Sequence, residues 1–115
     1  SFTAQSMPTN IIVNHCQKGN RLLNHIKNVG WEFGNIIPDY AIGDICALFL
    51  SLKYHLLHPD YIYQRSKLVK GYKLRVLLCL VDIEHNQHAL EELAKLALAA
   101  ELTLLLAWRC LFENS

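Results

Sequence analysis

The clearest pattern of apolar and polar positions is ICALFLSLKY at 45–54, which predicts one long β-strand. Because successive side chains of a strand point to opposite faces, this pattern defines two sides. One side consists of Cys46, Leu48, Leu50, Leu52 and Tyr54, and the other of Ala47, Phe49, Ser51 and Lys53. The first side is typical of a core. The second combines an aromatic ring, a hydroxyl and an ammonium group, so it is either a half-exposed sheet face or a binding surface.

Strands and helices alternate along the rest of the chain. Apolar and β-branched runs predict strands at 11–13, 31–34, 39–43, 74–83 and 102–108. Helices are expected at 21–28, at 59–68 with Pro59 in the first turn, and at 86–100 with Asn86 as N-cap. Because the 74–83 strand is apolar on both faces, we expect an α/β domain with helices on both faces of the sheet.

The chain of 115 residues suits one domain, with a flexible arm at 1–10 and a folded unit at 11–115. Only seven residues follow Trp108, so the helix that would normally cover the last strand is expected to be missing. The longest apolar run, 96–108, is interrupted by Glu101 and is shorter than the roughly 20 residues of a membrane span. Residues 1–10 also lack the apolar segment of a secretory signal. We therefore expect no membrane association.

Charge is distributed unevenly, although the formal net charge is only +1. Residues 1–75 carry nine Lys/Arg and four Asp/Glu, whereas residues 76–115 carry two and six. This asymmetry is compatible with one electropositive surface or with scattered solvated charges. The cysteines, at 16, 46, 79 and 110, have no CxxC spacing, which argues against a zinc ribbon or redox motif. A reduced, intracellular protein fits better than a disulfide-linked scaffold.

Histidines occur as two closely spaced pairs, His55 with His58 and His85 with His88. On a helix, this spacing can place two ligands on one metal ion. No third acid or cysteine lies at a matching interval, so satisfied or solvated histidines are the better interpretation. We expect no metal and no cofactor.

A tyrosine and an arginine, Tyr61 and Arg65, lie four residues apart in the helix predicted at 59–68. Residues at that spacing share one side of a helix. A ring beside a cation can stack on nucleic-acid bases or hold a peptide. The alternative is a half-exposed surface on which the aromatic residues occur by chance.

A long segment, WEFGNIIPDYAIGDICALFLSLKYHLLHPDYIYQR at 31–65, resembles the central domain of the excision-repair cross-complementing group-one family. The similarity extends from NIIVNHCQKGN at 10–20 to LTLLLAW at 102–108. Members of this family are non-catalytic partners of the XPF structure-specific endonuclease. The resemblance implies an α/β fold with an XPF-type nuclease-like central sheet flanked by helices. It also implies a nuclear protein that acts in nucleotide excision repair.

The resemblance further implies that the nuclease site is degenerate. The active nucleases of the XPF type resemble a pattern of a Gly-Asp pair, then Glu-Arg-Lys, then another Asp. In these nucleases the carboxylates hold a divalent metal. Asp39 takes the place of the first acid and Tyr54 that of the last. Leu48, Phe49 and Leu50 stand in place of Glu-Arg-Lys. Because leucine and phenylalanine cannot bind Mg²⁺, we expect a regulatory domain without catalysis.

In this family the lost site is similar to a groove that holds a short glycine-containing segment of the damage-verification protein XPA. The resemblance places the peptide-binding residues at Asn20, Asp39, Phe49, Ser51, Lys53, Tyr54, Leu57, His58, Tyr61 and Arg65. Glycines would let the peptide backbone lie flat against aromatic rings, and tyrosine hydroxyls could bond to it. By alternation Tyr54 belongs to the core side of the strand, although the resemblance places it in the groove. A strand bend near His55 would account for the difference.

Binding of single-stranded or junction DNA to the same surface is the alternative function. Its residues would be Lys18, Asn20, Arg21, Lys53, Tyr54, Tyr61, Arg65 and Lys67. Such binding is expected to fall steeply as salt rises. A residual metal-dependent nuclease is a third, less favoured hypothesis, because its only acids would be Asp39, Asp44 and Asp82.

The chain departs from the family pattern at two positions. Cys16 and Lys53 stand where members commonly have arginine, so we expect a weaker grip on phosphate or carboxylate groups. The family's C-terminal tandem helix-hairpin-helix region, which pairs with XPF, lies outside these residues. Pairing with XPF through that region is therefore not expected of this chain.

Overall fold

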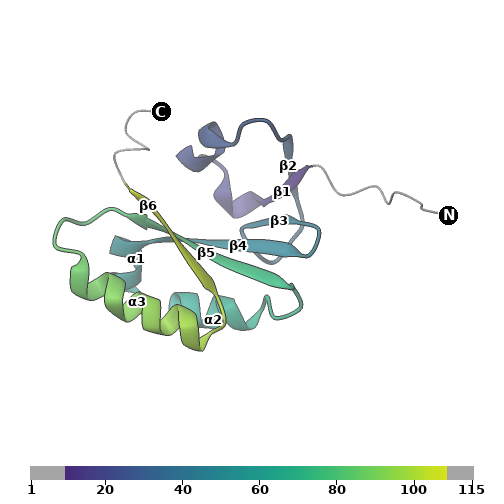
Figure 1. Ribbon diagram of the computed structural model, residues 1–115. Helices are drawn as coiled ribbons and strands as arrows, with labels where there is room; N and C mark the ends of the chain where they lie inside the picture. Colours follow the sequence, from purple (N-terminus) through teal and green to yellow (C-terminus); the bar gives the residue numbers. More distant parts are fainter. Residues whose placement is uncertain (1–9, 109–115) are drawn as a thin grey trace.

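The computed structural model describes residues 10–108, which form one six-stranded sheet with helices packed against it (Figure 1). The strands are β1 (Ile11–Asn14), β2 (Trp31–Gly34), β3 (Tyr40–Ile42), β4 (Ile45–Ser51), β5 (Leu74–Val81) and β6 (Thr103–Trp108). They lie in the order β2-β1-β3-β4-β5-β6. β3 is antiparallel to both of its neighbours, and the other neighbouring pairs are parallel. The expected α/β class is confirmed.

Three α-helices lie on the same face of the sheet (Figure 1). They are α1 (Leu52–Leu57), α2 (Tyr61–Lys67) and α3 (Gln87–Ala99). In the register of β4 with β5, Leu48 lies opposite Leu77, so both side chains point to this face. Leu52, Ile62 and Leu93 from the three helices bury themselves against that row. Burial of such side chains contributes about 1.5–3 kcal/mol each, so this layer is the core that fixes α1 and α2.

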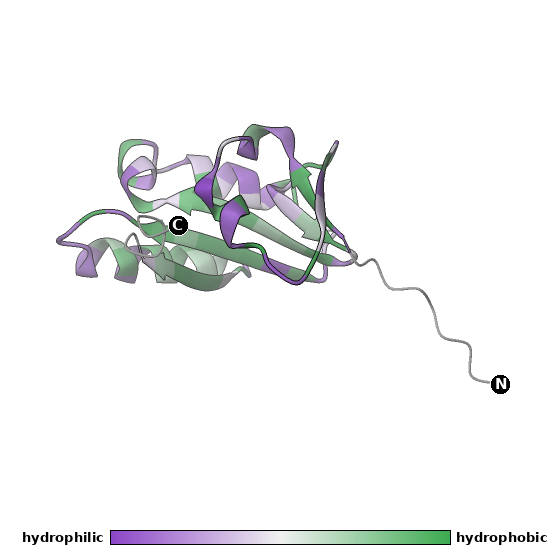
Figure 2. Ribbon diagram, turned by 90° about the horizontal axis from the view of Figure 1, so that it is seen from above, coloured by the Kyte–Doolittle hydropathy of each residue, from purple (hydrophilic) through white to green (hydrophobic). Residues whose placement is uncertain are grey.

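The opposite face of the sheet carries no α-helix among residues 10–108. The 3₁₀-helices η1 (His15–Gln17) and η2 (Arg21–His25) lie above it, and Figure 2 shows them as polar segments in front of apolar strands. Beyond them, Leu105 remains 50% exposed beside an apolar hollow of about 250 Å³. The expectation of helices on both faces therefore holds for one face. Residues 109–115, on which the expectation of a missing last helix falls, lie outside the described range, as does the arm at 1–9.

The junction after β4 differs from the single strand predicted over 45–54. The strand ends at Ser51, whose hydroxyl accepts a hydrogen bond from the Tyr54 backbone N–H (3.2 Å) and caps α1. The Lys53 N–H donates to the Asp82 carboxylate (2.8 Å), and the Ser51 hydroxyl donates to the same group. No bend near His55 is needed, because alternation stops where the helix begins. Tyr54 thereby leaves the core side.

The prediction for the segment at 21–28 was also wrong. The segment was expected to be an α-helix, but it forms only the 3₁₀-helix η2, which has no buried residue. The Asn20 side chain caps this turn by accepting from the Leu22 N–H (2.9 Å). The chain leaves helical conformation by Asn28, whose φ is +67°. Apolar residues that are only half buried cannot supply the packing that a longer helix needs.

Two helix starts also differ in detail from the prediction. α2 begins at Tyr61 rather than at Pro59, because the Tyr61 N–H closes a turn on the His58 carbonyl (3.1 Å). Asn86 is the N-cap of α3, as expected, but its side chain donates to the Ile83 carbonyl (3.0 Å) instead of capping. No helix of residues 10–108 has the length and apolar character needed to cross a membrane.

Candidate binding groove

The carboxyl end of β4, helix α1 and the start of α2 surround two adjoining hollows. The smaller, of about 310 Å³, is lined by Cys16, Gln17, Phe49, Leu50, Ser51, Tyr54 and Tyr61. The larger, of about 520 Å³, is lined by Tyr54, Leu57, His58, Pro59, Asp60, Tyr61 and Gln64. Because both share Tyr54 and Tyr61, we treat them as one feature and call it the aromatic groove.

Three rings gather where the two hollows meet. The rings of Tyr54 and Tyr61 are edge to face, with centroids 5.0 Å apart. The His58 ring tilts against Tyr54 at 4.4 Å. The Tyr54 side chain remains 41% exposed, so its ring can still meet a ligand. Such a cluster offers ring faces for packing and hydroxyl groups for hydrogen bonds.

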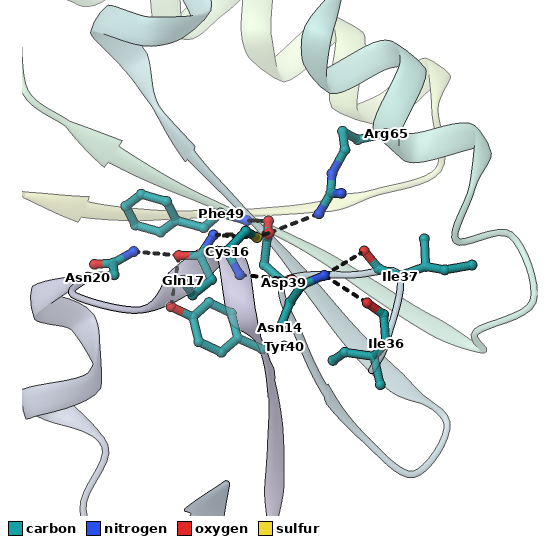
Figure 3. A network of polar contacts seen from close by, with 10 residues as sticks. All are labelled: Asn14, Cys16, Gln17, Asn20, Ile36, Ile37, Asp39, Tyr40, Phe49 and Arg65. Atoms are coloured by element: carbon teal, nitrogen blue, oxygen red, sulfur yellow. Dashed lines mark hydrogen bonds and ion pairs between the residues drawn. The ribbon is translucent and has the colours of Figure 1, made fainter. Parts of the chain in front are cut away.

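Beneath the groove lies a fully buried carboxylate, Asp39, which accepts hydrogen bonds from four groups (Figure 3). Its Oδ1 accepts from Arg65 Nη2 (2.8 Å), Gln17 Nε2 (3.0 Å) and the Cys16 thiol (3.4 Å). Its Oδ2 accepts from the Phe49 backbone N–H (2.7 Å). Buried ion pairs persist when such bonds satisfy the remaining lone pairs. Asp39 therefore ties the 3₁₀ segment, β4 and α2 together.

Gln17 extends this network toward the surface. Its Oε1 accepts from the Tyr40 hydroxyl (3.2 Å) and from Asn20 Nδ2 (2.7 Å). Asn14 fixes the adjoining loop, because its amide donates to the Ile36 carbonyl (2.7 Å). These bonds hold the wall of the groove formed by residues 14–20 against the sheet (Figure 3).

Burial keeps the hydroxyl and thiol groups of this site protonated. It raises the pKa of Tyr61, and the nearby Asp39 carboxylate raises it further. The same two causes raise the pKa of Tyr40 and of Cys16. At neutral pH these side chains therefore act as neutral hydrogen-bond donors, and the Cys16 thiol is a poor nucleophile.

Arg65 is the cation of the site, and much of its binding capacity is already used. Its side chain is 20% exposed, pairs with Asp39, and lies with its guanidinium carbon 5.9 Å from the Tyr61 ring centroid. Its Nε is buried and has no hydrogen-bond partner within residues 10–108. Arg65 thus joins the Asp39 carboxylate to the Tyr61 ring.

The groove is lined mainly by aromatic, apolar and amide side chains. Within residues 10–108, no group of three or more His, Cys, Asp or Glu side chains is placed to hold a metal ion. The carboxylate of Asp39 is occupied by its four donors, and the hydrophobic Leu48 and Leu50 flank Phe49 in β4. What the groove offers a ligand is ring surface, tyrosine hydroxyls and a shallow wall of amides.

The structure brings together most of the residues predicted to hold a peptide. Phe49, Ser51, Tyr54, Leu57, His58 and Tyr61 line the aromatic groove. Asp39, Arg65 and Asn20 belong to the polar network beneath it. Lys53 is exposed and lines neither hollow. Whether these residues bind a ligand stays a prediction.

The residues predicted to bind DNA are spread more widely. Lys18 and Arg21 are exposed on the 3₁₀ segment and line neither hollow of the groove. Lys67 lies on another side of α2, in a hollow of its own. Gln17 and Gln64 line the groove but were not predicted. Gln64 follows Tyr61 by three residues, and this helical spacing could have identified it.

Comparison with known proteins identifies the family. Residues 8–111 match the family described as "Binding domain of DNA repair protein Ercc1 (rad10/Swi10)". The chain belongs to this family. The resemblance inferred from 31–65 is therefore confirmed, and the Ercc1/Rad10 match covers the groove and the core alike.

Relatives with the same assignment come from fungi and a plant. The chain is 57% identical over 100 residues to the mating-type switching protein swi10 of Schizosaccharomyces pombe, covering 85% of this chain and 40% of that protein. It is equally identical over 100 residues to DNA excision repair protein ERCC-1 of Arabidopsis thaliana, covering 85% and 24%. It is 35% identical over 111 residues to DNA repair protein RAD10 of Saccharomyces cerevisiae, covering 91% and 52%. The chain thus spans about a quarter to a half of these Ercc1/Rad10 relatives.

Among solved structures, XPF from Aeropyrum pernix has the same fold. The TM-score is 0.68 at 13% sequence identity, over 86% of this chain and 56% of that one. At such low identity the likeness concerns the fold alone. The nuclease-like sheet expected for this Ercc1/Rad10 domain is confirmed.

Proposed function

We propose that this chain is a non-catalytic scaffold domain of nucleotide excision repair. In this proposal the aromatic groove docks a short glycine-containing peptide of an XPA-type damage-verification protein in the nucleus. An XPF-type endonuclease, bound through another part of the same protein, would thereby be recruited to the lesion. The observation that carries the proposal is the ring cluster of Tyr54, His58 and Tyr61, which lies next to the end of β4, the strand that the resemblance equates with the nuclease motif.

The chemistry of the groove supports a peptide with little side-chain bulk. Edge-to-face rings 5.0 Å apart leave narrow apolar surfaces against which a glycine backbone can lie flat. The raised pKa of Tyr61 keeps its hydroxyl available as a donor for a peptide carbonyl.

The absence of catalysis is part of the proposal. A nuclease of the XPF type would need carboxylates where β4 carries Leu48, Phe49 and Leu50. The remaining acid, Asp39, is committed to Arg65 and three other donors. A lone carboxylate in that state does not form a site for a hard divalent metal.

Fluorescence anisotropy of a labelled glycine-containing XPA-type peptide tests the proposal. We expect saturable binding that Tyr61→Ala weakens by about 1–3 kcal/mol, as truncation of an aromatic anchor does. Tyr63→Ala is the matched control, because Tyr63 lies in the same helix but outside the groove. Equal affinity of the wild type and Tyr61→Ala would contradict this placement of the peptide.

Single-stranded or junction DNA in the same groove is the second candidate function. It is favoured by the exposed ring of Tyr54 and by the guanidinium of Arg65 beside Tyr61, since rings and cations together bind unpaired bases. Its signature is steep weakening with salt, which peptide docking by rings and backbone bonds does not share. A flat salt response would count against DNA in the groove.

A further inference from the structure

A second hollow lies on the side of α2 that faces away from Arg65. It has a volume of about 390 Å³ and is lined by Tyr63, Ser66, Lys67, Lys70, Arg75, Ala99, Ala100 and Glu101. We call it the basic hollow. The Lys67 ammonium lies 4.3 Å from the centroid of the Tyr63 ring, which is itself 48% exposed. The hollow therefore presents a cation and an aromatic ring side by side.

Positive charge exceeds negative charge in this hollow. Glu101 is its only lining acid among the described residues, and it pairs with Arg75 at 3.1 Å. Lys67 and Lys70 have no carboxylate within ion-pairing distance among residues 10–108. Two ammonium groups are thus left to attract an anion from solution.

The exposed side of α2 connects the basic hollow with the aromatic groove. Gln64 follows Tyr61 by three residues and lines the groove, and Lys67 follows Gln64 by three and lines the basic hollow. Residues three apart are neighbours on a helix surface. A helix of seven residues is about 10 Å long, which is enough to contact neighbouring phosphates of one DNA strand.

We propose that the basic hollow is a phosphate-binding surface for the backbone of DNA, in which Lys67 and Lys70 contact phosphates next to the Tyr63 ring. DNA is favoured over an acidic peptide because the exposed ring provides a face for a base as well as the charge. The chain's membership of a DNA-repair family agrees with this partner. The basic hollow shares no lining residue with the aromatic groove, so a peptide in the groove leaves Lys67 and Lys70 uncovered.

The test measures anisotropy of labelled single-stranded and duplex oligonucleotides over a range of salt concentrations. The variant is the double substitution Lys67→Gln and Lys70→Gln. The control double substitution is Lys27→Gln and Lys95→Gln, which removes the same charge from exposed lysines outside both hollows. We expect the first variant alone to lose affinity. Its slope of log affinity against log salt should be shallower by about 1.4 for single strands or about 1.8 for duplex.

Unchanged DNA affinity and salt slope in the Lys67/Lys70 variant would overturn the proposal. An equal loss of DNA affinity in both double variants would also overturn it. So would tighter binding of a polyglutamate peptide than of DNA by the basic hollow. Peptide anisotropy separates this proposal from the function assigned to the groove. The Lys67/Lys70 variant should bind the glycine-containing peptide as the wild type does. Loss of DNA binding in this variant, together with no peptide binding by the wild type, would support the basic hollow and reject only the peptide groove.

Discussion

Helix α2 contains the same pairing of a tyrosine and a cation twice, four residues apart in each case. Tyr61 lines the aromatic groove with Arg65 beneath it, and Tyr63 and Lys67 line the basic hollow. Beneath the first pair lies the buried Asp39, so Arg65 forms an ion pair in which the carboxylate side chain is 1% exposed. Beneath the second pair no acid is close enough to pair with Lys67 among the described residues. The comparison teaches that the neighbouring strands decide whether a cation on α2 is structural or available to a ligand.

Removal of the Arg65 side chain should have the largest effect on stability. Arg65→Ala leaves the Asp39 carboxylate buried without its ion-pair partner, which typically costs about 3–5 kcal/mol. Urea unfolding measures the loss, and Lys67→Ala is the matched variant, expected to change the unfolding free energy by less than about 0.5 kcal/mol. Equal losses in the two variants would remove the distinction between the two sides of α2.

Disruption of the half-buried ion pair between Arg75 and Glu101 should lower the unfolding free energy by an intermediate amount. The Arg75 side chain is 12% exposed, but its partner Glu101 is 83% exposed, so water already screens the interaction. We expect Glu101→Gln to lower the unfolding free energy by about 1 kcal/mol, with a smaller loss at high salt. Urea unfolding at low and high salt measures both values. A loss as large as that of Arg65→Ala would show that exposure of one partner does not weaken the pair.

The smallest effect is expected for a pair that is exposed on both sides. Lys73 and Asp44 are 3.6 Å apart, and their side chains are 84% and 70% exposed. Lys73→Ala should change the unfolding free energy by less than about 0.5 kcal/mol, because exposed pairs contribute little. Thermal unfolding at two salt concentrations checks this value. A loss above 1 kcal/mol would mean that the position of a pair in this sheet matters more than its burial.

Much of the fold could be predicted from local patterns. The alternation of 45–51 identified the buried row that includes Leu48 and Leu50, and both are 1% exposed. The β5 strand and α3 were predicted with boundaries close to those observed, because each is long and strongly apolar on its buried face. The 21–28 segment failed because its spacing was helical but no neighbouring surface was free to bury it.

The site was predictable only in part, for a similar reason. The predicted peptide-binding residues came from the resemblance and, for Tyr61 and Arg65, also from spacing on α2, and six of the ten line the groove. Tyr54 appeared misplaced because alternation was continued past Ser51, where the cap with Asp82 ends the strand. The side chains that bond to Asp39 lie 22 to 26 positions away in the chain, and no local pattern indicates such partners.

The sequence by itself determined the family, the α/β class and which residues of β4 and α2 carry rings or charge, because these follow from residue type and short-range periodicity. Only the tertiary structure decided that Arg65 pairs with Asp39, whereas Lys67, on another side of the same helix, has no carboxylate partner among residues 10–108. It also decided that Gln17 and Cys16 converge on Asp39. The physical reason is that the interaction energy of a charged side chain depends on the dielectric environment and on the partners around it. Segments distant in sequence supply both.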